Sequence, residues 1–204
     1  MTIKIYVVGA KGGCGKSTIS YHLALELSKK YNVLLVDLSA SRTISLLFGL
    51  TGSLIEGNDY YTESENLGIL SFSSYLNSKV DKDIIKTRYY EVIDEKDIVI
   101  VDSPIHVEPF LYLEQSISLM RSIVLPIAIP NEMIILATLN YVSNYFSGSV
   151  QGPLVVNMAK NPLSGYFTIP FYKDLLFKGF WLVKTPKEIE KLAEIVIHIK
   201  ESLG

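Results

Sequence analysis

The sequence predicts an α/β fold, a doubly wound and mostly parallel sheet of about seven strands flanked by helices. Short apolar runs alternate with longer segments of helical pattern, which is the order of parallel βαβ units. Of the 204 residues, 49% are hydrophobic, as expected for strands that helices cover on both faces. No repeat, low-complexity tract or linker interrupts this order, so residues 1–204 are expected to form a single domain.

Seven apolar runs are expected to be strands, because each is short and lies between turn residues. They cover residues 3–8, 33–37, 67–72, 97–102, 122–129, 153–157 and 166–169. The clearest run is 97–102, in which four β-branched apolar residues stand between two aspartates. Residues 51–66 combine glycine, asparagine and acidic residues, so an irregular surface segment is expected there.

Helices are expected between these strands. They cover residues 17–30, 41–48, 83–93, 109–119 and 131–146. Gly49 is expected to end the second of them. A last helix is expected to have Pro186 at its first position, with Thr185 and Glu188 as a capping box. Apolar residues then recur at helical spacing from Ile189 to Leu203.

Residues 9–18, between the first strand and the first helix, read Gly-Ala-Lys-Gly-Gly-Cys-Gly-Lys-Ser-Thr. The glycines let the backbone wrap around an anion, and the helix adds the positive end of its dipole. Lys16 places a cation near the terminal phosphates of a nucleotide, and Ser17 offers a hydroxyl to Mg²⁺. The pattern indicates a P-loop, although Ala10 stands where that motif has glycine, and a second lysine, Lys11, lies within the loop. A glycine-rich turn without a ligand is the alternative.

Residues 11–18 resemble the deviant Walker A motif of the ParA/MinD family of P-loop ATPases. The resemblance implies a P-loop NTPase fold, binding of ATP with Mg²⁺, and a homodimer in which Lys11 reaches phosphates held by the partner subunit. The residues that it implies in nucleotide binding are Lys11, Gly12, Gly13, Cys14, Gly15, Lys16, Ser17 and Thr18. The family also includes the nitrogenase iron protein, arsenite-pump ATPases and scaffold carriers for iron–sulfur clusters, so the motif leaves the cellular role open.

A second acidic strand end, Asp102, is followed by Ser103 and Pro104. This order resembles the Walker B aspartate and the switch II sequence of the same family. A hard oxygen anion at the carboxyl edge of a parallel sheet suits Mg²⁺, and the resemblance places Asp102 near the metal through a bound water. Ser17 and Asp102 are therefore the expected metal residues. An aspartate that only caps the next turn is the alternative.

Asp37 ends the second strand, where the family usually carries Asp-x-Asp in switch I. Here Ser39 replaces the second aspartate, which in the family orients the attacking water. This loss is expected to slow hydrolysis by roughly 10²–10⁴-fold, while Asp37 still helps to organise Mg²⁺ and its waters. ATP binding with slow turnover is therefore predicted, with Lys11, Lys16 and Asp37 as the catalytic residues. Glu108 is an alternative source of the missing acceptor.

Three later residues resemble the adenine site of the family. Asn157 ends a strand where family members use asparagine to hydrogen-bond adenine. Ile169-Pro170 resembles an Ile-Pro pair whose following loop closes over the base. The resemblance therefore adds Asn157, Pro170 and Phe171 to the nucleotide-binding residues, although each signal alone is ordinary turn chemistry.

The length and the early P-loop resemble those of short ParA-type partition proteins. That resemblance implies ATP-dependent, nonspecific DNA binding, a centromere-binding ParB-like adaptor, and a role in segregating a plasmid or chromosome. The candidate DNA contacts, with a solvated helix face as the alternative, are Lys173, Lys178, Lys184, Lys187 and Lys191. Alternative functions are a MinD-like spatial regulator acting on a protein or membrane surface, and a nucleotide-binding scaffold with little hydrolysis.

Composition limits the remaining functions. The net charge of −2 argues against coating nucleic acid by bulk charge. The single cysteine, Cys14, excludes disulfides within the chain and cannot supply the paired cysteines of a cluster carrier. The first apolar run leads directly into the P-loop and no run is long enough to cross a bilayer, so no signal peptide or spanning helix is expected. Acidic residues in the last helix argue against membrane binding. The protein is expected to be cytoplasmic, and nucleoid-associated if it binds DNA.

Overall fold

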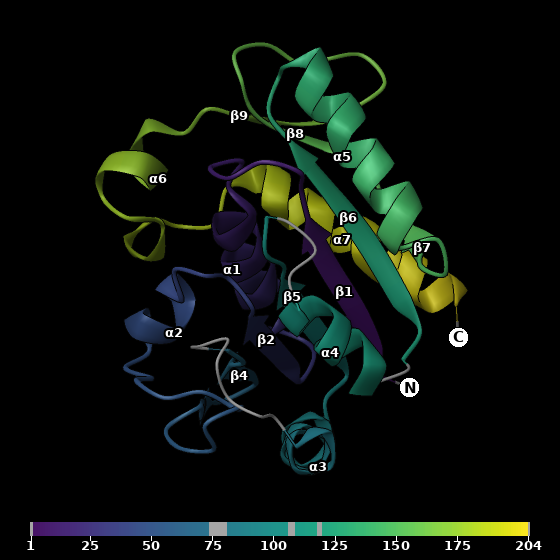
Figure 1. The fold of residues 1–204 in the computed structure, drawn as a ribbon. Coiled ribbons are helices and arrows are strands. Elements are labelled where there is room, and N and C mark those ends of the chain that lie inside the picture. The colour runs from purple at the N-terminus through teal and green to yellow at the C-terminus, as the bar shows by residue number, and fades with distance from the viewer. Residues whose placement is uncertain (1, 74–80, 106–108, 118–119, 204) are drawn as a thin grey trace.

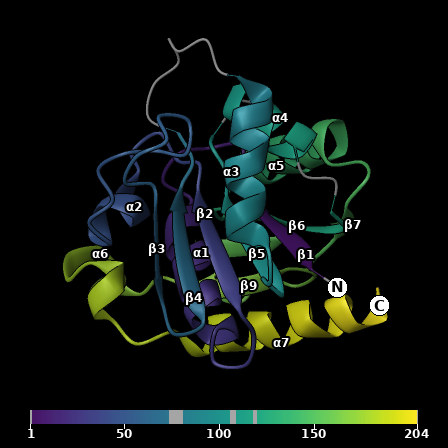
Figure 2. The ribbon, with the colours of Figure 1, turned by 90° about the horizontal axis from the view of Figure 1, so that it is seen from below.

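The computed structural model describes residues 2–73, 81–105, 109–117 and 120–203. Within these residues a nine-stranded sheet forms the core, with helices on both faces (Figures 1 and 2). The strands are β1 (Ile3–Val8), β2 (Val33–Asp37), β3 (Tyr61–Ser64), β4 (Leu67–Ser71), β5 (Ile98–Asp102), β6 (Ser122–Ala128), β7 (Val150–Gln151), β8 (Val155–Ala159) and β9 (Phe167–Pro170). The helices are α1 (Lys16–Leu27), α2 (Thr43–Leu47), α3 (Lys82–Ile93), α4 (Pro109–Ile117), α5 (Glu132–Tyr145), α6 (Lys173–Phe177), the 3₁₀ turn η1 (Phe180–Leu182) and α7 (Lys187–Ser202).

The sheet brings the acidic strand ends together. The strand order is β3-β4-β2-β5-β1-β6-β8-β9, with β7 paired to β6, and only β3 runs antiparallel to its neighbour among the described strands. In the register of β2 and β5, Asp37 lies beside Asp102. Asp102 also lies beside Val7 of β1, one residue before that strand ends. Both carboxylates therefore lie at the edge where β1 leads into the glycine-rich loop.

Alternate residues of β1 face opposite sides of the sheet, as the period of a strand requires. Ile5 and Val7 lie in a buried cluster with residues of α1 and α7. Tyr6 and Val8 lie in a second cluster with residues of α3, α4 and α5. Helices α1 and α7 therefore cover one face, and α3, α4 and α5 cover the other (Figure 1).

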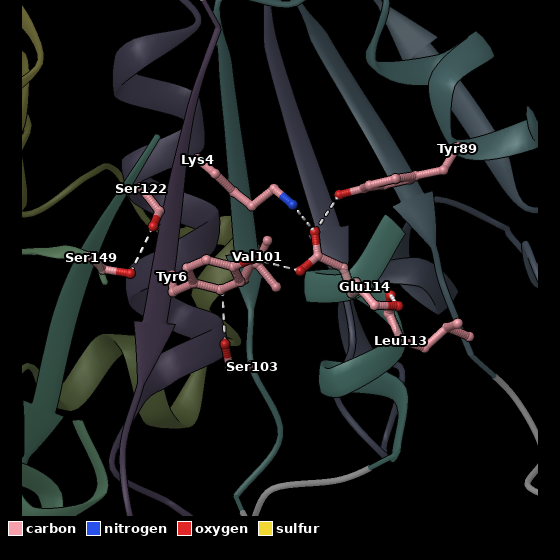
Figure 3. A network of polar contacts seen from close by, with 10 residues as sticks. Lys4, Tyr6, Tyr89, Val101, Ser103, Leu113, Glu114, Ser122 and Ser149 are labelled. Atoms are coloured by element: carbon pink, nitrogen blue, oxygen red, sulfur yellow. Dashed lines mark hydrogen bonds and ion pairs between the residues drawn. The ribbon is translucent and has the colours of Figure 1, made fainter. Parts of the chain in front are cut away.

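A buried polar network joins β1, α3 and α4 (Figure 3). Glu114 of α4 accepts hydrogen bonds from the ammonium group of Lys4, from the Tyr6 hydroxyl (2.8 Å) and from the Tyr89 hydroxyl (2.6 Å). Burial, and then the charge of Glu114, raises the pKa of both tyrosines, so their hydroxyls remain protonated donors. Because α4 follows the end of β5, this network fixes the helix that lies just beyond Asp102.

Several elements differ from the sequence-based expectation. Residues 51–66 are not wholly irregular, because they contain the edge strand β3. The sheet has nine strands rather than about seven, since β3 and the two-residue β7 were not expected. The short elements α6 and η1 were also missed. In the described ranges, no helix has both the length and the apolar character needed to span a membrane.

The start of α7 also differs from the expected capping box. Pro186 is the N-cap residue, and its side chain makes no capping hydrogen bond. A capping box uses the backbone N–H of the N-cap residue, which proline lacks. Thr185 Oγ1 instead lies 3.2 Å from Nδ1 of His22 on α1, and Glu188 accepts a hydrogen bond from the hydroxyl of Tyr172.

Candidate functional site

The loop between β1 and α1 forms one wall of a cavity of about 480 Å³. Gly13 (φ +75°) and Gly15 (φ +87°) have the left-handed backbone that favours glycine. The other walls come from residues 39–41, which follow β2, from residues 103–105, which follow β5, and from Met158 of β8. Four segments that are far apart in the sequence therefore meet around one cavity at the carboxyl edge of the sheet.

The two lysines of this loop lie in different environments. Lys16 is 8% exposed, and its Nζ lies 3.5 Å from the carbonyl oxygen of Lys11. Burial lowers the pKa of Lys16, and the negative charge of Asp102 opposes this shift. The side chain of Lys11 is exposed. Lys16 is therefore an internal cation that lines the cavity, whereas Lys11 is accessible to a second molecule.

Asp102 is fully buried at the end of β5. Burial, followed by the charge of Asp37, raises the pKa of Asp102 to about 7, while Ser17, Lys16 and Ser20 act in the opposite direction. The Ser20 hydroxyl donates to Oδ1 of Asp102 (3.4 Å), and Oδ2 has no hydrogen-bond partner among the described residues. A buried carboxylate oxygen without a donor, close to the hydroxyl of Ser17, fits a divalent cation.

Both oxygens of Asp37, by contrast, are occupied by neighbouring residues. Oδ1 accepts hydrogen bonds from the backbone N–H and the hydroxyl of Ser39 (3.0 and 2.6 Å). Oδ2 accepts hydrogen bonds from the backbone N–H and the hydroxyl of Ser45 (2.9 Å each). Asp37 was expected to organise Mg²⁺ and its waters, but in this structure its carboxylate organises the loop that follows β2. The Ser39 hydroxyl donates its proton to that carboxylate, so only its oxygen lone pairs remain to accept a hydrogen bond from water.

A second, mostly apolar cavity of about 230 Å³ lies beside the loop. Thr18, residues 169–171 and Leu175 form part of its wall, which includes the expected Pro170 and Phe171. Apolar walls with a few polar groups are typical of small-molecule sites. Asn157 also lines this cavity, and its side-chain nitrogen donates to the carbonyl oxygen of Cys14 (2.8 Å). The site thus has a polar compartment at the loop and an apolar compartment next to it.

A family model described as the CobQ/CobB/MinD/ParA nucleotide binding domain matches residues 5–203. The chain belongs to this family. The fold is similar to that of the cell division ATPase MinD from Pyrococcus furiosus, with a TM-score of 0.75 and 19% identity over 98% of this chain and 100% of that chain. A putative plasmid partition protein from Borrelia burgdorferi, bound to AMPPNP, gives a TM-score of 0.67 and 20% identity over 97% of this chain and 98% of that chain. At these identities the similarity establishes the fold alone, and it confirms the expected ParA/MinD architecture.

Curated relatives of higher identity match a shorter part of the chain. A cytosolic Fe-S cluster assembly factor Nubp2 homolog from Drosophila willistoni is 34% identical over 119 residues, which is 49% of this chain and 45% of that protein. A Nubp2 homolog from Aedes aegypti is 30% identical over 118 residues, or 49% of this chain and 46% of that protein. The match spans less than half the length of these relatives.

Two serines of this ParA/MinD-family site were not anticipated. Ser20 lies two residues beyond the motif that identified Ser17, but it is three residues after Ser17 on α1, a spacing that places both on one helix face and could have indicated it. Ser45 of α2, eight positions after Asp37, donates a hydrogen bond to its carboxylate, and no local periodicity of the sequence connects the two residues. Such a contact depends on how the loop folds back.

Met158 was also missed, although it lines both cavities. Its backbone is left-handed (φ +62°), and it lies at the irregularity between Asn157 and Ala159 in the pairing of β8 with β9. A left-handed backbone is unfavourable for a residue with a side chain, and such strain is concentrated at functional sites. Nothing in the amino-acid pattern around methionine predicts this conformation.

The hydrogen bond from Asn157 leads to a prediction about what this residue recognises. A Cβ on Gly15 would lie 2.3 Å from the Asn157 nitrogen, so the amide packs directly against the loop backbone. We expect Asn157→Ala to weaken binding of ATP and of inorganic triphosphate to a similar extent, roughly 10-fold, because the lost contact holds the loop. Isothermal titration calorimetry with both ligands measures this.

The control for this experiment is Asn140→Ala on the exposed side of α5, which is expected to bind both ligands as wild type does. If Asn157→Ala weakened ATP binding and left triphosphate binding unchanged, the amide would instead contact the base. The expected adenine contact of Asn157 would then hold.

The raised pKa of Asp102 predicts a pH-dependent stability in the absence of ligand. The pKa of Asp102 is about 7 in the folded chain, and its ordinary value is 3.8. Between about pH 4 and pH 7 the folded chain therefore binds a proton at Asp102 that the unfolded chain has released. The contribution of Asp102 to the free energy of unfolding is greatest below about pH 4 and falls as the pH rises to 7. We expect Asp102→Asn to melt at a higher temperature than wild type above pH 7, with the difference vanishing near pH 4. Circular dichroism melts without nucleotide or Mg²⁺ measure this, and a difference independent of pH would contradict it.

The lysines proposed from the sequence as DNA contacts are Lys173, Lys178, Lys184, Lys187 and Lys191, and all are exposed. Lys178 forms an ion pair with Asp174 (2.9 Å). Exposure is compatible with phosphate contact and equally with a solvated surface. The alternative acceptor Glu108 lies outside the described residues.

Proposed function

We propose that this chain is a ParA-type switch that binds ATP with Mg²⁺, dimerises through the nucleotide, and acts in segregating a plasmid or chromosome. The proposal depends mainly on one observation. A cavity at the carboxyl edge of the sheet has a buried lysine, Lys16, in its wall, and Asp102 beside it has an unpartnered carboxylate oxygen. Bound phosphates would give the buried ammonium group of Lys16 a negative partner. A bound divalent cation would give that carboxylate oxygen of Asp102 a positive partner.

Each group has a stated part in this proposal. Backbone N–H groups of the loop and Lys16 hold the terminal phosphates, and the base occupies the 230 Å³ cavity. Ser17 and Asp102 hold Mg²⁺, which neutralises phosphate charge when bound. The exposed Lys11 contacts phosphates held by a second copy. The ATP-bound dimer binds DNA nonspecifically and a ParB-like adaptor, which would place it at the nucleoid in the cytoplasm.

The dimer is tested by Lys11→Ala. Light scattering with ATP and Mg²⁺ is expected to show dimers for wild type and monomers for Lys11→Ala, while nucleotide binding to the monomer is largely retained. Lys30→Ala, an exposed lysine beyond the end of α1, is the matched control and is expected to dimerise. Equal dimerisation of wild type and Lys11→Ala would refute the role of Lys11 in the partner's site.

Slow ATP hydrolysis is the expected kinetic behaviour, and we call a protein with this behaviour a slow switch. The reason is that Ser39, which is hydrogen-bonded to Asp37, stands where a second aspartate would follow. We expect Ser39→Asp to raise the single-turnover rate of ATP hydrolysis by roughly 10-fold or more, because it restores a carboxylate that can accept a proton from water. The Ser39 hydroxyl lies 2.6 Å from Asp37 Oδ1, so the new carboxylate also faces repulsion and should lower the melting temperature of the ligand-free protein. An unchanged or lower rate would contradict the slow-switch proposal.

A nucleotide-binding scaffold with little hydrolysis is the second candidate, and the occupied carboxylate of Asp37 favours it. Iron–sulfur carriage, which the names of the Nubp2 relatives raise, has less support. The chain has one cysteine, and the described residues contain no group of three or more His, Cys, Asp or Glu side chains that could hold a metal. A turnover rate for wild type that is indistinguishable from zero would favour the scaffold.

A further inference from the structure

Residues 171–184, which contain α6 and η1, expose large apolar side chains at one edge of the molecule. In both views α6 lies at the outer left edge, away from the sheet (Figures 1 and 2). Leu176 is 63% exposed, Phe177 72%, Trp181 44% and Leu182 71%. Apolar residues this exposed and this close in sequence are more than the scattered single residues found on ordinary surfaces. We call these four side chains, with the neighbouring Lys173, Lys178 and Lys184, the α6–η1 surface.

The fold holds this surface in place. The ring of Phe180 packs edge-on against Tyr21 of α1, with 5.3 Å between the centroids. The hydroxyl of Tyr172, which precedes α6, donates to Glu188 of α7. Gly179 has a left-handed backbone (φ +86°), and a Cβ there would lie 2.7 Å from the Trp181 ring. The segment is therefore attached to α1 and α7, and Leu176 also lines the edge of the 230 Å³ cavity.

The charge of the segment is opposite to that of the rest of the chain. Residues 171–184 contain three lysines and one aspartate, a net charge of +2, whereas the whole chain has −2. The remaining residues therefore carry −4. All three lysines are exposed, and Lys173 lies over the ring of the exposed Phe177, 5.8 Å from its centroid. Positive charge and apolar area are therefore located on the same surface.

We propose that the α6–η1 surface docks on an anionic lipid bilayer. Apolar side chains enter the boundary between headgroups and acyl chains, and the lysines contact anionic headgroups while their stems lie along the apolar region. DNA phosphates would satisfy the lysines and leave the four large apolar side chains against water and charge. A second copy of the same surface would bring like charges together. A bilayer with anionic lipid satisfies both parts of the surface.

This surface is separate from the C-terminal helix. The acidic residues that argued against membrane binding lie on α7, and the α6–η1 surface precedes them. Docking by one short element with few charges is expected to be weak and reversible. It does not require nucleotide, so it can be measured independently of the proposed ATP switch.

Trp181 is the single tryptophan of the chain, so its fluorescence reports directly on this surface. Without nucleotide, we expect its emission to shift to shorter wavelength with vesicles of equal phosphatidylcholine and phosphatidylglycerol. Lipids brominated on the acyl chain are expected to quench it. Pure phosphatidylcholine vesicles are expected to give little change. An unchanged emission with anionic vesicles overturns the proposal.

Variants separate the apolar and the charged contributions. Phe177→Asp with Leu182→Asp is expected to abolish the shift, and Lys173→Glu with Lys184→Glu to weaken partitioning by roughly 10- to 100-fold. The matched control is Met133→Asp with Leu136→Asp on α5, where the native side chains are 74% and 56% exposed, and it is expected to bind as wild type does.

The same variants detect a nucleic-acid surface. If the lysine variant lost DNA binding while vesicles never altered Trp181, the surface would contact DNA and the lipid proposal would fail. Equal partitioning of wild type and the Phe177→Asp, Leu182→Asp variant would also overturn it, since the apolar side chains would then contribute nothing. If an aspartate variant failed to fold by circular dichroism, the lysine variant and the wild-type fluorescence would still decide the outcome.

Discussion

Replacing Lys16 with alanine is expected to weaken ATP binding by about 100-fold or more. One hydrogen bond to a charged group contributes about 1.5–3 kcal/mol, and a lysine in this loop would contact two phosphates. The same change is expected to leave the ligand-free protein at least as stable as wild type. Burial already disfavours the ammonium group, as its lowered pKa shows, so its removal takes away a buried charge.

Lost ATP affinity together with retained stability would show that Lys16 binds the ligand and does not stabilise the fold. Calorimetric titration with ATP and Mg²⁺ gives the affinity, and thermal unfolding without ligand gives the stability. Lys30→Ala is expected to leave both unchanged. Wild-type affinity in a correctly folded Lys16→Ala protein would remove the phosphate-binding role from the loop and with it the proposed function. A large loss of stability would mean that the ammonium group is structural.

The central sheet could be predicted from the sequence because its strands are buried on both faces. The runs that became β1, β2 and β5 are buried at every position and apolar at nearly every position, so no alternation is needed to recognise them. The edge strand β3 was missed for the opposite reason. Its four residues, Tyr61–Ser64, are half-buried or exposed and include polar side chains, so composition alone resembles a loop. Pairing with β4 is what makes it a strand.

Only part of the candidate site could be predicted from the sequence. The loop glycines and Ser17 could be predicted because they belong to one motif, in which a fixed order of residue types reflects one local geometry. Contacts between distant segments were not readable, as with Ser45 on Asp37 or Asn157 on the Cys14 carbonyl. Those depend on a register and on a loop path that only the folded chain defines.

The second large effect is expected at Glu114, which none of the sequence motifs identified. Glu114→Ala is expected to lower the free energy of unfolding by about 3–5 kcal/mol, because it removes the carboxylate that balances the buried ammonium group of Lys4. It also takes the acceptor away from the hydroxyls of Tyr6 and Tyr89. For a chain of this size the melting temperature should fall by roughly 6–20 °C.

A charge-neutral pair tests whether the loss comes from the unbalanced charge. In Lys4→Met with Glu114→Leu both charges are absent, and apolar side chains of similar size replace them. We expect this double variant to be more stable than Glu114→Leu alone and than Lys4→Met alone, because a buried ion pair costs less to replace than to break. Urea unfolding of the four proteins gives the comparison. If the double variant lost the sum of the two single losses, the network would act through its hydrogen bonds to the tyrosines, and the position of α4 would depend on them rather than on the ion pair.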